Sequence, residues 1–101
     1  MEKVDFSRYG KTFQVKLTYL ILTERAFADQ IGEVLDYNFL EFKYLQSIVR
    51  NIYKYRDKYE VYPSLKIMAT LIKTDIDDDL VKDQAKEYLV NVLRDASIIQ
   101  D

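Results

Sequence analysis

Apolar residues recur at intervals of three and four along most of the chain, which is the spacing of one face of an α-helix. This pattern predicts five helices, at about residues 11–22, 24–35, 41–58, 65–73 and 78–95. The connections between them are short, and no sustained heptad repeat indicates a long coiled coil. We therefore expect an all-α fold, a compact bundle of about five helices.

Each predicted helix carries an apolar stripe, and together the stripes predict the core. Residues 11–22 are apolar on most sides, so we expect this helix at the centre of the bundle. The predicted core consists of Leu17, Leu20, Phe27, Ile31, Leu35, Phe39, Leu45, Val49, Ile52, Leu65, Leu89 and Val92. We expect a loose N-terminal arm over residues 1–10 and a single helical domain over residues 11–101.

Polar residues mark several predicted helix ends. Thr23 and Ser64 are suitable N-caps for the second and fourth helices, because their hydroxyl groups can accept a hydrogen bond from a free backbone N–H. Asp78 and Asp79 stand at the start of the fifth helix, where carboxylates interact favourably with the helix dipole. Pro63 disfavours a helical conformation at the residue before it, so the third helix must end earlier.

The composition narrows the chemistry that this chain can perform. It contains no cysteine and no histidine, which excludes a thiol nucleophile, a Cys/His zinc site and a Ser-His-Asp triad. The two glycines are isolated, so there is no glycine-rich phosphate loop. We expect a chain that is not an enzyme and that binds neither a cofactor nor a metal ion.

Charge is balanced overall but uneven along the chain, whose net charge is −2. Residues 43–58 carry five basic residues against one acidic residue, and residues 75–83 carry five acidic residues against one basic residue. Opposite patches suit docking to a partner or head-to-tail contact between copies, and two solvated faces are an equally good interpretation. The acidic run lacks the glycine and distal glutamate of an EF-hand, so we interpret it as a loop and a helix start.

A basic stripe of Lys43, Arg50, Lys54 and Lys58 follows the third predicted helix, opposite its apolar face. Five of the nine tyrosines lie within residues 44–62. Aromatic rings among basic side chains can stack on bases while the cations neutralise phosphates, but tyrosine is also common in protein interfaces and cores. We favour protein contact over direct nucleic-acid binding. The candidate interaction surface is Lys43, Arg50, Lys54, Lys58 and Tyr62.

Several segments occur in a characteristic order between residues 13 and 71. An apolar run at residues 17–22 precedes Phe27, a short amphipathic segment and the element Tyr37-Asn38-Phe39. A long helix with Ile48, Ile52 and Tyr55-Arg56 then leads to the stretch Tyr59-Glu60-Val61-Tyr62-Pro63-Ser64-Leu65. This order resembles the N-terminal domain of DnaB-type hexameric replicative helicases, in a divergent bacteriophage-like form.

The resemblance implies a domain of DNA replication that performs no chemistry itself. In that family the domain joins its copies into a collar above the motor ring and offers docking surfaces for primase or a helicase loader. We therefore expect a self-associating protein whose partners are its own copies, primase or a loader, in the cytoplasm of a bacterial host. No membrane partner is expected, because the apolar run Tyr19-Leu20-Ile21-Leu22 is far too short to span a bilayer.

Two other functions stay open at this point. The basic stripe with its neighbouring tyrosines could belong to a small helical nucleic-acid-binding module, whose affinity would fall steeply with salt because binding displaces counterions. The chain could also be a phage regulator that binds a host protein.

Overall fold

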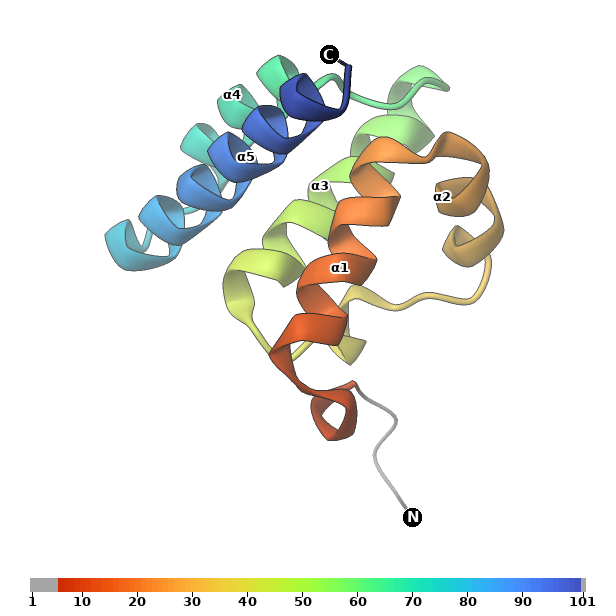
Figure 1. Cartoon of the computed structure of the whole chain (residues 1–101), viewed down its shortest axis with the longest axis horizontal. Helices are drawn as coiled ribbons and strands as arrows, with labels where there is room; N and C mark the ends of the chain where they lie inside the picture. The colour runs from red at the N-terminus through yellow and green to blue at the C-terminus, as the bar shows by residue number, and fades with distance from the viewer. Residues whose placement is uncertain (1–5, 101) are drawn as a thin grey trace.

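The structure is a computed structural model that describes residues 6–100, and this part contains helices and no strand. Its elements in chain order are η1 (Ser7–Tyr9), α1 (Gly10–Thr23), α2 (Arg25–Gly32), η2 (Tyr37–Phe39), α3 (Lys43–Tyr59), α4 (Leu65–Asp75) and α5 (Asp79–Gln100), where η marks a 3-10 helix. The predicted all-α class, a compact bundle of five α-helices, is confirmed (Figure 1).

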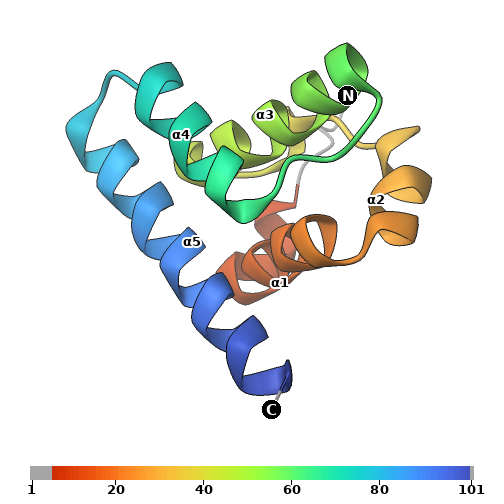
Figure 2. The same cartoon turned by 90° about the horizontal axis from the view of Figure 1, so that it is seen from above.

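The helix α3 is the centre of the fold. It packs against α1, α4 and α5, while α2 packs against α1 on the side away from the α4–α5 pair (Figures 1 and 2). Seven residues of α3 are buried, against four of α1. The expectation that residues 11–22 lie at the centre of the bundle is therefore wrong, because α1 packs mainly against α2 and α3, whereas α3 packs against α1, α4 and α5.

Polar side chains fix the starts of α4 and α5. Ser64 is the N-cap of α4 as predicted, since its Oγ accepts a hydrogen bond from the backbone N–H of Ile67 at 3.1 Å. At α5, Oδ1 of Asp78 accepts a hydrogen bond from the N–H of Val81 at 3.0 Å. Each cap satisfies a backbone donor that has no partner inside its helix.

The predicted cap of α2 is wrong. Thr23 is the last residue of α1, and its hydroxyl donates a hydrogen bond to the carbonyl of Tyr19 at 2.8 Å. The residue before α2 is the extended Glu24, whose side chain forms no capping hydrogen bond. A threonine near a helix end can bond backward to the preceding turn as readily as forward, and here α1 continues far enough to use it.

The predicted core is half right. The buried members are Leu17, Leu45, Val49, Ile52, Leu89 and Val92. The prediction of full burial is wrong for the other six, which remain partly exposed: Leu20, Phe27, Ile31, Leu35, Phe39 and Leu65. The short α2 lies at the edge of the bundle, so its apolar residues cover the core from outside. The centre is completed by Ile21, Ala28, Leu40, Tyr44, Ile48, Met68, Ile72, Ile76, Ala85 and Tyr88.

Residues 6–10 belong to the folded domain. The N–H of Phe6 donates to the carbonyl of Phe39 at 2.8 Å, and its ring meets those of Phe13 and Phe39 edge-on at centroid distances of 5.5 and 5.6 Å. The buried Gln14 donates to the carbonyl of Phe6 at 3.2 Å and accepts from the N–H of Glu41 at 2.7 Å. The loose arm is therefore wrong for residues 6–10, while residues 1–5 lie outside the described part, as does residue 101 of the predicted domain.

The last helix is longer than predicted. α5 continues to Gln100 rather than ending near residue 95, and it lies beside α4 along the edge of the molecule (Figure 2). Neither α5 nor any other helix within residues 6–100 combines the length and the apolar character needed to cross a membrane.

Candidate functional site

The basic stripe lies along one side of α3, as its spacing predicts. Lys43, Lys54 and Lys58 are exposed, and Arg50 is partly exposed. This side of α3 faces the C-terminal part of α4 and the loop that follows it. The stripe therefore lies in two different environments, one acidic and one aromatic.

In the acidic environment, the two patches of opposite charge meet each other. Arg50 forms a hydrogen-bonded ion pair with Asp75, the last residue of α4. Lys43 and Arg50 also line a shallow pocket of about 240 Å³ together with Asp75, Asp77 and Asp78. Because α4 packs on α3 with its C-terminal end beside Arg50, charges that we expected as two separate patches partly neutralise each other within the chain.

Asp75 holds the end of α4 to the middle of α3. It accepts hydrogen bonds from Arg50 and from Nδ2 of Asn51, the latter at 3.1 Å, and Asn51 also donates to the Ser47 carbonyl at 2.7 Å. Partial burial raises the pKa of the Asp75 carboxyl, but these hydrogen bonds and the charges of Arg50 and Lys54 outweigh it and hold the pKa below its usual value. Asp75 is therefore ionised at neutral pH.

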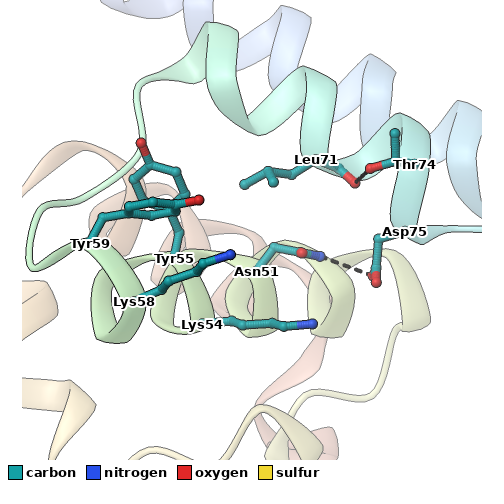
Figure 3. Close-up of a pocket in the computed structure, with 8 residues that line it drawn as sticks. All are labelled: Asn51, Lys54, Tyr55, Lys58, Tyr59, Leu71, Thr74 and Asp75. Atoms are coloured by element: carbon teal, nitrogen blue, oxygen red, sulfur yellow. Dashed lines mark hydrogen bonds between the residues drawn. The ribbon is translucent and has the colours of Figure 1, made fainter.

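In the aromatic environment, Lys54 and Lys58 lie beside a pair of tyrosines. With Tyr55 and Tyr59 they line an open pocket of about 250 Å³ between α3 and α4 (Figure 3). The two ring centroids are 4.5 Å apart, and Nζ of Lys58 lies 5.2 Å from the Tyr59 centroid. Within the described residues the only salt bridge is the one at Asp75, so both lysines can attract an anion. We call these four residues the Lys/Tyr pocket.

Tyr62 does not belong to either environment. Its hydroxyl donates a hydrogen bond to Asp29 of α2, and the guanidinium groups of Arg25 and Arg56 lie 5.7 and 5.5 Å from its ring centroid. Partial burial and the bond to Asp29 raise the pKa of Tyr62 against the opposing effect of Arg56. Tyr62 lines neither pocket of the basic stripe, and its ring ties α2 to the end of α3.

A third surface, which the sequence did not reveal, is an apolar groove between α4 and α5. Its volume is about 640 Å³. Val90 and Leu93 are 61% and 55% exposed within it. We call it the α4–α5 groove, and its lining residues are Leu65, Lys66, Ala69, Thr70, Lys73, Lys86, Leu89, Val90 and Leu93. Exposed apolar residues that gather in one groove make it a candidate docking surface.

A signal for this groove was present in the sequence but was ambiguous. Beside its inward stripe, α5 carries apolar residues at Val90 and Leu93, so its apolar arc is wider than one neighbouring helix needs. The same width would also suit a helix surrounded by other helices of the bundle. Only the packing of α4 and α5 at the edge of the molecule shows that part of this arc is left uncovered.

The acidic run is structural in the described part of the chain. Asp75 pairs with Arg50, and Asp78 caps α5. Within residues 6–100 no group of three or more acidic residues is placed to hold a metal ion, and each buried side-chain nitrogen or oxygen there has a hydrogen-bond partner.

Comparisons with protein-family models, curated proteins and solved structures found no match to this chain. Its function is therefore inferred from its surfaces.

Proposed function

We propose that this chain is a non-catalytic protein-interaction domain of a phage-type replicative DNA helicase, which mediates subunit assembly and docks primase or a helicase loader. The observation that carries the proposal is the α4–α5 groove. Val90 and Leu93 stay exposed there although the core beneath them is fully packed, as shown by Met68 and Ile72 at 0% exposure. Burial against another protein would remove this surface from water, which is the main favourable contribution in most protein associations.

The resemblance to DnaB-type N-terminal domains supports the finer part of this proposal. The stretch 59–65 in that resemblance forms the connection between α3 and α4. Glu60 adopts the left-handed conformation there, with φ of 62°, and the buried Pro63 precedes the cap residue Ser64. This connection orients α4 against α3, so the residues that carry the resemblance also help to build the groove.

The test is a binding measurement with this chain and the primase and helicase loader encoded in the same genome. Light scattering over a concentration series reports self-association, and calorimetric titration reports binding of the other two proteins. We expect at least one of these interactions, weakened about tenfold or more by Leu93→Ser in the groove. The matched control is Leu80→Ser, which changes a residue that is 69% exposed on the same helix but outside the groove.

Three results would separate the parts of this proposal. A chain that stays monomeric at high concentration and binds neither protein would refute it. Binding that survives Leu93→Ser would keep the function but remove the groove as its site. Equal losses with Leu93→Ser and Leu80→Ser would point to a general effect on the helix rather than to a docking surface.

A second candidate function, nucleic-acid binding, is favoured by the Lys/Tyr pocket. Two cations one helical turn apart, next to the exposed ring of Tyr59, can contact a phosphate and an adjacent base of a single strand. For this function we expect single-stranded DNA to bind with an affinity that falls steeply with salt, and the double variant Lys54→Glu/Lys58→Glu to abolish binding. Lys16→Glu, at an exposed lysine of α1, is the control. Unchanged affinity in the double variant would exclude the pocket.

A further inference from the structure

The shape of the α4–α5 groove suits a helix. α4 spans 11 residues and is therefore about 16 Å long, or about three turns. It lies side by side with α5 (Figure 2), and a third helix packs into the depression between two neighbouring helices with its side chains between theirs. The small side chains of Ala69 and Thr70 leave room on the α4 side, while Leu89, Val90 and Leu93 form the apolar α5 side.

The rim of the groove is basic. Lys66 and Lys73 lie on the α4 side and Lys86 lies on the α5 side. In the described part of the chain no carboxylate lines the groove, and none of the three lysines is in a salt bridge. The chain as a whole carries a net charge of −2, so this is a local excess of positive charge around an apolar floor.

These charges argue against a second copy of the chain seated face to face in the groove. In such a symmetric contact each rim would lie against the identical rim of the other copy, which would bring the lysines together. Like charges placed opposite each other in an interface are strongly unfavourable. The complementary occupant carries acidic side chains beside an apolar face.

We propose that the α4–α5 groove binds an amphipathic helix of a partner protein, with the partner's apolar face on Val90 and Leu93 and its carboxylates beside Lys66, Lys73 and Lys86. This inference rests on the proposed protein-interaction function and names the chemistry of the partner. Apolar residues at positions i, i+3, i+4 and i+7 of the partner would contact the floor, as in other helix-in-groove complexes. Glutamate or aspartate at the flanking positions would meet the rim.

The experiment uses the full chain and three synthetic helical peptides labelled with a fluorophore. The acidic peptide has leucines on one face and glutamates at the flanks, the basic peptide has lysines in place of the glutamates, and the third is a scrambled acidic peptide. Fluorescence anisotropy measures their dissociation constants. We expect the acidic peptide to bind about tenfold or more tightly than either of the others, with an affinity that falls as salt screens the rim charges.

Variants of the chain separate a docking role from a general effect on stability. Leu93→Ser is expected to weaken the acidic peptide about tenfold, whereas Leu80→Ser leaves its affinity unchanged. The double variant Lys66→Glu/Lys86→Glu is expected to reverse the preference so that the basic peptide binds more tightly. A merely structural change would weaken both peptides alike. Because Lys66, Lys86 and Leu93 are exposed, each variant should keep the thermal unfolding midpoint of the original chain.

Three outcomes would overturn the inference. One is equal affinity of the acidic and basic peptides. Another is Leu93-dependent binding of vesicles of anionic lipid in preference to the peptide, which would assign the groove to a membrane surface. The third is no peptide binding by a chain that still binds primase, loader or itself, in which case the proposed function stands and only this inference fails. A chain that binds neither peptides nor proteins would refute both.

Discussion

The two sides of the α4–α5 pair carry similar apolar residues but differ in what covers them. On the inner side Ile72 is 0% and Val92 is 3% exposed, whereas on the outer side Val90 is 61% and Leu93 is 55% exposed. The inner side is covered because α3 packs against both helices. The outer side has no such neighbour in the described part of the chain. Apolar character alone therefore does not distinguish a core face from a docking face.

The largest expected effect concerns the two isoleucines of α4, Ile67 and Ile72. Ile72→Ala removes a fully buried side chain and leaves a cavity, so we expect a loss of about 2–5 kcal/mol in the free energy of unfolding. Ile67→Ala removes a side chain that already contacts water, and its cost should stay below about 1 kcal/mol. Urea denaturation measures both values. Similar costs would mean that the two faces of α4 are assigned wrongly.

A smaller effect of the same kind is expected for the two valines of α5. Val92→Ala should cost about 2 kcal/mol, because it deletes buried methyl groups. Val90→Ala should change the unfolding free energy by about 0.5 kcal/mol or less, while weakening a partner in the α4–α5 groove. The two residues differ only in burial, so a reversed order would contradict the orientation of α5.

The next test concerns the bond that ties the inner side of α5 to α1. The hydroxyl of the buried Tyr88 donates to the Val15 carbonyl at 2.7 Å. Burial, with smaller contributions from Tyr44 and Tyr19, raises its pKa above the usual 10.0. The unfolded chain therefore loses this proton first. The stability from Tyr88 is complete below pH 10.0 and is lost as the pH rises toward the raised pKa of the folded state.

We expect Tyr88→Phe to cost about 1 kcal/mol at neutral pH, through the lost hydrogen bond, and to flatten the decline of stability above pH 10.0. Unfolding curves between neutral and alkaline pH measure both effects. Tyr59→Phe, at a residue 52% exposed, is the control and should leave the alkaline decline unchanged. An undiminished decline in Tyr88→Phe would show that another group causes it.

The smallest effect is expected at the pair that ties the end of α4 to α3. The side chains of Arg50 and Asp75 are 39% and 28% exposed, so solvent screens the pair and Asp75→Asn should cost less than about 1 kcal/mol at neutral pH. The pKa of Asp75 is lowered from 3.8. Its contribution is therefore present above pH 3.8 and disappears as the pH falls through the lower pKa of the folded state.

Acid unfolding of Asp75→Asn measures this contribution. We expect a smaller loss of stability on acidification than in the original chain, and less sensitivity to salt. The neighbouring loop residue provides the control Asp77→Asn, which should keep the acid sensitivity of the original chain. If both variants respond to acid alike, the pair with Arg50 is not the source of the dependence.

The predictability of the fold from sequence differs sharply between helices and surfaces. All five α-helices were predicted, and the cap at Ser64 is confirmed. The predicted cap at Thr23 is wrong because α1 includes this residue and its hydroxyl bonds backward to the Tyr19 carbonyl. The size and spacing of Phe27 and Phe39 predict core positions, yet both stay partly exposed because their elements lie at the edge of the bundle.

The candidate site was less predictable than the fold. The stripe of Lys43, Arg50, Lys54 and Lys58 lies on one side of α3, as the helical period requires. The helical period does not determine which residues pack opposite the stripe. Here Lys43 and Arg50 lie beside the acidic run, and Lys54 and Lys58 lie beside tyrosines. The α4–α5 groove combines residues of two helices, so the wide apolar arc of α5 does not predict it without the position of α4.

The five helices follow from the amino-acid sequence, because apolar spacing, caps and proline act over a few residues. Which apolar faces become buried and which charges meet depends on how the helices pack. Arg50 and Asp75 are 25 residues apart, and their pairing depends on how α4 packs against α3. Burial and Coulomb attraction depend on which groups lie close together in space, not on their separation along the chain. Both are therefore set only once the helices have packed.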